Sequence, residues 1–345
     1  MLPIFRIVAV AMVSLLTFAT IARAQGPAGP ASQPAAAKPR PTVVMCPPSF
    51  ENGRCFRELF EQPDAWRRTR GLVDSIGYAD HCLNRQFTDE QLAAWLPMLT
   101  RWGLKLELEV GAVKPWGPTA EKTFTPERAM WDRFIRLGGV IHAISMDEPL
   151  CATRNELHQP DDYAVTETAK FIALVRKNYP QILVGDIEPY PFIPLAGQIA
   201  WIDALQRRLK DLHVRGLDFY RLDVNWAEFV ALDRGNWPEV KKIELACRQR
   251  GIPFSLIYWA STLPDMKRRG LADDSTWYVS IMQQAYDYAL IDGRPDQYVI
   301  ESWIEAPAHC VPETGEFTFT RSVRDFAEKF VKRPGPPSSQ PEASH

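Results

Sequence analysis

Two adjacent acids close an apolar run in the segment 144–150, which reads ISMDEPL. These acids are Asp147 and Glu148, and a proline follows them directly. One acid at this place would be typical of a turn, whereas two carboxyl groups can also act as a general acid and a general base. The segment ILVGDIEP at 182–189 repeats the pattern, with Glu188 before a proline. Carboxyl groups at the ends of apolar runs therefore form the first candidate site.

These acids belong to a regular alternation of apolar runs and helical stretches. Strand and helix repeated until eight strands are present predict a (β/α)8 barrel, the TIM-barrel fold. The competing fold, an open doubly wound sheet, would carry a Gly-rich phosphate turn after an early strand, and the sequence has no GxGxxG or P-loop motif. The eight runs are TVVMCPP (42–48), VDSIGYA (73–79), LKLELEV (104–110), IHAISMDEP (141–149), ILVGDIEP (182–189), LDFYRLDVNW (217–226), PFSLIYWAS (253–261) and YVIESWIE (298–305).

Helix-start signals support the stretches between the runs. Thr88 is followed three residues later by Gln91, which is typical of a capping box. Pro126 is expected in the first turn of a helix that two glycines close. Both signals fall where the barrel pattern needs a helix.

Alternation along each strand predicts which side chains face the lumen of the barrel. In the run 104–110 the apolar residues share one parity, so Lys105, Glu107 and Glu109 are expected inside. In the run 141–149 we expect Glu148 to point along the lumen and Asp147 to turn aside. The remaining side chains predicted to face the lumen are Asp186, Glu188, Arg221, Asp223, Asn225, Glu301, Trp303 and Glu305.

The acids inside the barrel have two interpretations. In the first, Lys105 and Arg221 neutralise them in a structural ion network, because an unpaired buried charge is costly. This interpretation concerns Glu107, Glu109 and Asp223. In the second, acids nearer the strand ends lie where a substrate binds in this fold. This interpretation concerns Glu148, Glu188, Glu301 and Glu305.

Aromatic residues also occur near the predicted strand ends. Flat aromatic faces can stack on the C–H-rich face of a sugar ring, although each of these residues could equally belong to the core. The residues concerned are Trp116, Tyr190, Trp226, Tyr258, Trp259 and Trp303.

The segment ISMDEP at the end of the fourth strand resembles that of TIM-barrel glycoside hydrolases. It is similar to the large clan whose acid/base is a Glu at this strand end, usually in an Asn-Glu-Pro-like context. The resemblance implies that Glu148 is the acid/base and that Asp147 stands in the place of the Asn. The seventh run, PFSLIYWAS, departs from the clan because it lacks the Glu that serves as nucleophile there.

The second carboxylate must therefore come from another strand. Glu188 and Glu301 are the first candidates, followed by Asp223 and Glu305. The predicted function is an exported glycoside hydrolase that cleaves an oligosaccharide or polysaccharide between two carboxyl groups and needs no cofactor. Further substrate-binding residues are predicted to be Asp147, Asp186, Glu305, Arg221, Asn225 and the six aromatic residues named above.

Two other functions remain open from the sequence. A metal-dependent isomerase or lyase could use the lumen acids to hold Mg²⁺ or Mn²⁺ through oxygen. The second alternative is a barrel that binds carbohydrate without catalysis, and the absence of an acid in the seventh run motivates this alternative. Sensitivity to a chelator and turnover of a glycoside would separate the three functions.

The two ends of the sequence predict export and a single catalytic domain. Residues 1–24 have a basic start, an apolar stretch and a small-x-small pattern that ends at Ala24, which predicts a signal peptide cleaved after that residue. Residues 25–41 predict a Pro/Ala-rich linker, 42–332 the catalytic barrel and 333–345 a disordered tail. The predicted location is the periplasm or the medium, with no membrane attachment after cleavage.

Charge and cysteine content limit the partners further. Lys and Arg number 40 against 42 Asp and Glu, so the chain has no basic footprint for nucleic acid. Six cysteines in an exported chain predict disulfide bonds, with connectivity left open. Cys247 lies inside an amphipathic pattern and is expected to be a lone core thiol.

Overall fold

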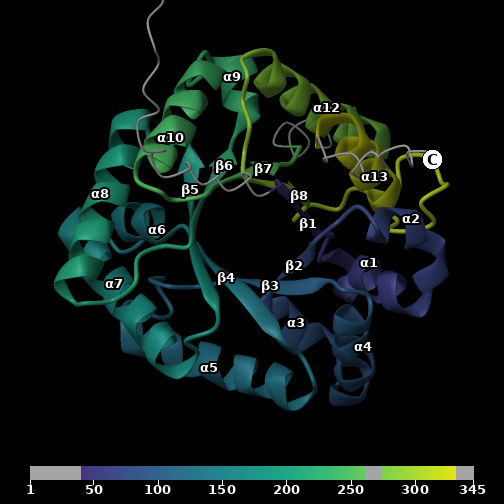
Figure 1. The fold of residues 1–345 in the computed structure, drawn as a ribbon, viewed down its shortest axis with the longest axis horizontal. Coiled ribbons are helices and arrows are strands. Elements are labelled where there is room, and N and C mark those ends of the chain that lie inside the picture. Colours follow the sequence, from purple (N-terminus) through teal and green to yellow (C-terminus); the bar gives the residue numbers. More distant parts are fainter. Residues whose placement is uncertain (1–39, 261–272, 332–345) are drawn as a thin grey trace, which may run out of the picture. The chain divides into compact units, whose positions relative to one another are not determined.

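Eight parallel strands close into a barrel that helices surround (Figure 1). The structure is a computed structural model that describes residues 40–260 and 273–331. Each strand pairs with the next along the chain and β8 pairs with β1, which confirms the predicted (β/α)8 barrel. The strands are β1 (Thr42–Cys46), β2 (Ser75–Ala79), β3 (Lys105–Val110), β4 (Ile141–Asp147), β5 (Leu183–Tyr190), β6 (Phe219–Val224), β7 (Phe254–Tyr258) and β8 (Gln297–Glu301).

The helices lie between the strands along the chain and cover the outer face of the barrel (Figure 1). Thr88 and Gln91 form the predicted capping box at the start of α4. Thr119 caps α5, so this helix begins earlier than predicted and Pro126 lies inside it. The described helices are α1 (Phe50–Glu61), α2 (Arg67–Arg70), α3 (Asp80–Gln86), α4 (Asp89–Arg101), α5 (Ala120–Arg136), α6 (Pro149–Asn155), α7 (Asp161–Asn178), α8 (Leu195–Asp211), α9 (Trp226–Leu232), α10 (Trp237–Gln249), α12 (Asp274–Leu290) and α13 (Phe319–Phe330), with a 3₁₀ turn at Pro63–Trp66.

The barrel wall separates an outer core from a smaller apolar cluster in the lumen. Apolar residues of β3, β6 and β8 pack outward against the helices, which confirms the predicted parity of those three strands. The outward residues are Leu106, Leu108, Val110, Tyr220, Leu222, Val224, Tyr298 and Ile300. The apolar cluster in the lumen consists of Val44, Cys46, Ile187, Ile257 and Val299, with Trp259 packed on it.

The predicted orientation of β5 is wrong. Ile187 belongs to the lumen cluster, so Asp186 and Glu188 face the helices instead of the lumen. The indole N–H of Trp201 on α8 donates to the Asp186 carboxylate at 2.6 Å. Both faces of this strand carry apolar residues, and alternation alone therefore does not distinguish them.

Close packing fixes two glycines in the lumen. A Cβ on Gly185 would lie 1.9 Å from the Phe219 ring, and a Cβ on Gly77 would lie 2.3 Å from the Cys46 sulfur. Gly185 faces the lumen because the ring of Phe219 occupies the space that a side chain would need. The same packing places Asp186 on the outer face.

Arg221 forms an ion network one layer below the strand ends. Its guanidinium donates to Glu107 at 2.8 Å, to Gln297 at 2.6 Å and to Ser255 at 3.1 Å. Both charged side chains are buried, so this pair confirms the structural interpretation for Glu107 and Arg221. Lys105 has the inward parity of Glu107 but is exposed at the start of β3, and its pairing with the lumen acids stays a prediction.

Several predicted features lie outside the described residues. These are the signal peptide (1–24), nearly all of the linker (25–41) and the tail (333–345). Within the described part of the chain, no helix is long and apolar enough to span a membrane. All six cysteines are free thiols, so the structure does not support the predicted disulfides, and Cys247 is buried in the outer core as predicted.

Candidate functional site

Five carboxyl groups gather at the carboxyl ends of four strands, where active sites of this fold lie. We call them the mouth cluster: Glu109 of β3, Asp147 of β4, Glu148 directly after β4, Asp223 of β6 and Glu301 of β8. The charges of these groups act on one another across the lumen. Of these five, the predicted list of catalytic and binding residues omitted only Glu109.

Glu109 and Glu301 form a carboxyl pair within this cluster. Each of the two carboxyl groups affects the pKa of the other. Burial first and the charge of Glu301 second raise the pKa of Glu109. Burial also raises the pKa of Glu301, and Arg221 below it opposes the rise. The pair therefore holds at least one proton at neutral pH.

The tip of β4 brings both acids of the opening segment to the mouth. The Lys114 ammonium pairs with Asp147 at 2.6 Å, so the expectation that Asp147 turns aside is wrong. Glu148 has a left-handed backbone conformation, with φ 48° and ψ 50°, at the start of α6. Such a conformation is costly for a residue with a side chain and is concentrated at functional sites. This local turn explains why adjacent residues both reach the mouth.

Glu148 and Asp223 interact more closely than the strand order suggests. Burial first and the charge of Glu148 second raise the pKa of Asp223, while the Trp259 indole beside it opposes the rise. Burial and then the charge of Asp147 raise the pKa of Glu148, and Lys114 lowers it. Both residues are partly buried, and Oδ1 of Asp223 is a buried atom without a hydrogen-bond partner. A neighbouring carboxylate thus raises each pKa, Glu148 that of Asp223 and Asp147 that of Glu148.

A tryptophan pair adjoins this acid pair. The rings of Trp259 and Trp303 lie 4.1 Å apart with an interplanar angle of 39°. Trp303 is 37% exposed and presents an aromatic surface to solvent. Trp259 links this surface to Asp223, so aromatic and acidic groups meet as the sequence predicts for these two tryptophans.

Glu188 has a structural position. It is fully buried, and its two carboxylate oxygens accept the backbone N–H groups of Leu150 at 2.6 Å and Cys151 at 3.2 Å. These are the first free N–H groups of α6, whose positive end favours an anion. The predicted placement of Glu188 beside a substrate is therefore wrong, because its carboxylate anchors the helix that begins after Glu148.

Two predicted aromatic site residues belong to the outer core. The Tyr190 hydroxyl donates to Glu239 at 2.6 Å, and its ring packs on Phe229. Tyr258 stacks on Tyr298 with ring centroids 6.0 Å apart. Both side chains point away from the lumen, so their predicted place in a sugar site is wrong.

Three other predicted residues lie at the margin of the mouth. Asn225 precedes α9, and its side-chain amide donates to Glu228 at 3.4 Å. Trp226 is partly buried against the outer core. Glu305 is exposed and lines a small pocket beside α1.

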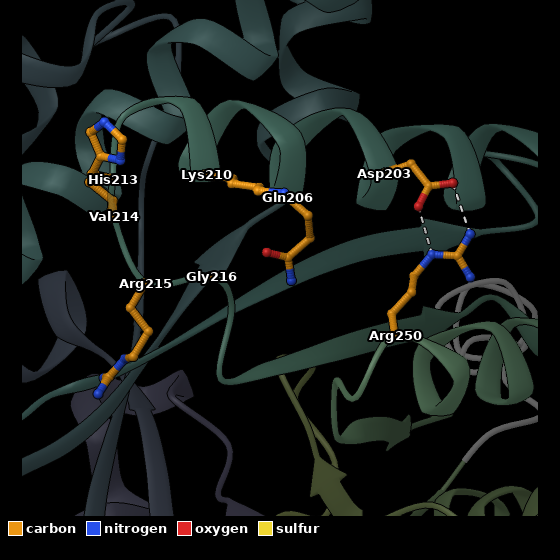
Figure 2. A pocket seen from close by; sticks show the side chains of 8 residues that line it. All are labelled: Asp203, Gln206, Lys210, His213, Val214, Arg215, Gly216 and Arg250. Atoms are coloured by element: carbon orange, nitrogen blue, oxygen red, sulfur yellow. Dashed lines mark hydrogen bonds and ion pairs between the residues drawn. The ribbon is translucent and has the colours of Figure 1, made fainter.

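Two pockets have linings that include none of the five mouth acids. The first has about 450 Å³ between α3 and α5, at the same end of the barrel, and Trp116 lines it. The second has about 720 Å³ at the amino end of the barrel (Figure 2). Asp203 is the acid among its lining residues, and Figure 2 shows it joined to Arg250, with N–O distances of 2.7 and 2.8 Å. Catalytic groups of this fold lie at the opposite end of the strands.

Metal ligation was one alternative from the sequence. Among residues 40–260 and 273–331, no group of three or more His, Cys, Asp or Glu side chains is arranged to hold a metal ion.

Comparisons with known proteins agree with the barrel fold. No family model matches the chain, and no curated protein matches it. One similar solved structure is AbfB, a family 51 α-L-arabinofuranosidase from Bifidobacterium longum, with 12% identity, 83% of this chain and 72% of that chain covered, and a TM-score of 0.47. Another is a glucosidase from Croceicoccus marinus, with 14% identity, coverage of 77% and 63%, and a TM-score of 0.46.

Other similar structures have different chemistry. The aldolase QR15 has 14% identity, coverage of 76% and 90%, and a TM-score of 0.42. At these identities the likeness concerns the barrel fold alone, since one fold hosts many activities. The argument for function therefore comes from the side chains at the mouth.

Proposed function

We propose that the protein is a glycoside hydrolase that cleaves an oligosaccharide or polysaccharide between Glu148 and Asp223. The supporting observation is that the charge of Glu148 reaches the Asp223 carboxyl group beside Trp259, whose ring packs on the exposed Trp303 ring. Glycoside hydrolysis needs a protonated carboxyl group and an ionised one near the same bond. Aromatic rings next to the pair supply a surface for the sugar.

The surroundings of the two groups suggest their roles. Burial and then the charges of Glu148 and Glu301 raise the pKa of Asp223 well above its ordinary value. This shift favours the protonated form of Asp223. Lys114 lowers the pKa of Glu148, which favours its ionised form. We assign Asp223 as the proton donor and Glu148 as the carboxylate that attacks or activates water. The sequence resemblance implied the opposite role for Glu148.

The pair Glu109 and Glu301 is assigned to binding. Burial raises the pKa of both groups, so each can carry a proton and donate a hydrogen bond as well as accept one. Carboxyl groups at this position can accept and donate hydrogen bonds to sugar hydroxyls. The predicted catalytic role of Glu301 is therefore replaced by a role in holding substrate.

We also propose that the protein is exported to the periplasm or the medium. The basic, apolar and small-x-small segments of residues 1–24 support this proposal. Expression of the full chain followed by mass analysis of the mature protein tests it. A mature chain that begins at Gln25 is expected, and one that retains Met1 contradicts the proposal.

The catalytic assignment is tested with substrates that differ in leaving group. Asp223→Asn should lower kcat/KM about 1,000-fold on oligosaccharides but only about tenfold on dinitrophenyl glycosides, because a dinitrophenolate leaves without a proton. Glu148→Gln should lower it about 1,000-fold on both substrates, because each needs the carboxylate. Asp287→Asn, on the outer helix α12, is the matched control and should retain full activity.

The outcomes separate the possible functions. Full activity of both variants contradicts the assignment of this pair. If Glu148→Gln instead of Asp223→Asn retains activity on dinitrophenyl glycosides, the two roles are exchanged. If the wild-type protein binds oligosaccharides without cleaving any, the mouth recognises carbohydrate and the proposed hydrolysis is refuted. Each variant is first checked for an unchanged thermal unfolding midpoint, which separates loss of chemistry from loss of fold.

A further inference from the structure

A second pocket adjoins the mouth cluster and is not used by the proposed chemistry. We call it the β2–β3 pocket, since its walls come from the segments that follow these two strands, and α3 and α5 lie side by side there (Figure 1). Its volume is about 450 Å³. Its lining residues are Asp80, His81, Asn84, Arg85, Gly111, Trp116, Glu127 and Met130.

Two buried carboxyl groups form part of the wall. Asp80 and Glu127 are each 1% exposed, and Asp80 lies close enough to raise the pKa of Glu127. The Trp131 indole donates to Asp80 at 3.0 Å, and the Gly111 N–H donates to Glu127 Oε1 at 3.2 Å. Glu127 Oε2 is buried without a hydrogen-bond partner, so it is available to a proton or to a hydroxyl group of a ligand. A buried polar atom of this kind is costly unless it finds a partner.

An exposed aromatic ring covers the same pocket. Trp116 is 60% exposed, and a Cβ on Gly111 would lie 2.5 Å from its ring. The ring therefore lies against the bare backbone at Gly111. The hydrogen bonds between Lys114 and Gly117, at 2.9 and 3.2 Å, close the turn that carries it. This turn fixes the ring although most of its surface faces solvent.

The pocket is contiguous with the mouth. The turn that carries Trp116 also carries Lys114, which pairs with Asp147 of the mouth cluster at 2.6 Å. His81 lines the pocket, and the charge of Asp147 in the mouth cluster reaches its imidazole. A chain bound at the mouth can therefore extend into the pocket.

We infer that the β2–β3 pocket binds a neutral sugar ring of an oligosaccharide whose scissile bond lies at the mouth cluster. Trp116 stacks on the ring, and the Asp80–Glu127 pair hydrogen-bonds its hydroxyl groups. The buried acids favour a neutral ring over an acidic sugar, since a second carboxylate would be repelled. This inference rests on the proposed function for the location of the scissile bond, and it makes the substrate a chain longer than a disaccharide.

The test measures how affinity grows with chain length. The neutral probes are disaccharides and hexasaccharides of glucose, xylose, mannose and arabinose, and a hexagalacturonate is the acidic probe. Each is titrated calorimetrically into the full chain, which carries Glu148→Gln to prevent turnover. We expect at least one neutral hexasaccharide to bind about tenfold or more tightly than its disaccharide, which is the scale of one stacked ring. Adding Trp116→Ala should reduce this ratio to about threefold or less.

Two further variants serve as controls. Trp116→Phe keeps a ring and should retain most of the length preference. Tyr286→Ala removes an aromatic ring of similar exposure, 49%, from α12 on the outer face and should leave the preference unchanged. A length preference that persists in Trp116→Ala overturns the pocket assignment, and tighter binding of the hexagalacturonate overturns the neutral class.

The proposed hydrolysis can fail separately. If the wild-type protein cleaves none of the probes while Trp116-dependent binding is present, the pocket assignment stands and the hydrolase assignment falls. If cleavage occurs but Trp116 has no influence on length preference, only the pocket assignment falls. If no saccharide binds at all, both are overturned.

Discussion

Replacing Glu127 by Gln should make the stability of the protein less sensitive to pH. Burial first, and then the hydrogen bond and charge of Asp80, raise the pKa of Glu127 to about 11. The folded protein therefore keeps this carboxyl group protonated, while the unfolded chain ionises it near its ordinary pKa of about 4.5. A raised folded pKa contributes stability that is fully present below the unfolded pKa and is lost as the pH rises toward the folded value.

The size of the loss follows from the linkage of protonation to folding. Between about pH 5 and about pH 7, the folded state retains the proton and the unfolded state releases it, so the free energy of unfolding falls by about 2.5 kcal/mol. The variant Glu127→Gln has no proton to lose at this position. Its amide can still accept from the Gly111 N–H through oxygen and donate to Asp80 through nitrogen. Its stability relative to wild type should therefore rise by about 2.5 kcal/mol over this interval.

Urea unfolding followed by tryptophan fluorescence measures this difference at each pH. Glu121→Gln is the matched control, because Glu121 is an exposed carboxylate on the same helix, α5. Its difference from wild type should change by less than about 0.5 kcal/mol across the interval. A Glu127→Gln difference that is equally flat would refute the reasoning, since it would show that the wild-type carboxyl group is not held protonated.

Two other changes test the packing that positions the site. Arg221→Met leaves the charge of the buried Glu107 unpaired and should lower the free energy of unfolding by about 3–5 kcal/mol. Adding Glu107→Met should restore much of this loss. Thermal unfolding of the single and double variants measures both effects. Gly185→Ala places a Cβ against the Phe219 ring and should lower the free energy of unfolding by about 1–3 kcal/mol. In the control Gly71→Ala the nearest atom is 3.4 Å from the new Cβ, so the loss should be under about 0.5 kcal/mol. Equal urea midpoints of the two variants would contradict the packing argument.

The sequence predicts the architecture well because alternation of strand and helix is a local pattern. All eight strands lie within or next to the apolar runs, and one-sided strands such as β3 reveal their lumen face directly. The sequence of β5 does not reveal its lumen face, because Ile187 and the outward residues of this strand are all compatible with burial. Only the Phe219 ring, which comes from the next strand, decides that Gly185 faces the lumen.

The site is less accessible to sequence reasoning because it depends on contacts between elements. Asp80 follows β2 as Asp147 ends β4, so the signal of an acid at a strand end was present for it. Glu127 gives no such signal, since it lies inside an amphipathic helix and becomes a pocket wall only through Asp80 and Gly111. Tyr190 and Tyr258 lie near strand ends, but this position does not determine whether the ring faces the lumen or the helices.

The anchoring role of Glu188 affects how mutational data on this chain are interpreted. Loss of its carboxylate would release the first turn of α6, and Glu148 occupies the strained residue just before that turn. An activity screen would then score Glu188 as essential although it never meets the substrate. Two successive strands thus carry the same Glu-Pro dipeptide: under the proposed function Glu148 takes part in the reaction, whereas Glu188 holds the first turn of α6. Conservation of the dipeptide among relatives would not tell the two apart, but the thermal midpoint of each variant would.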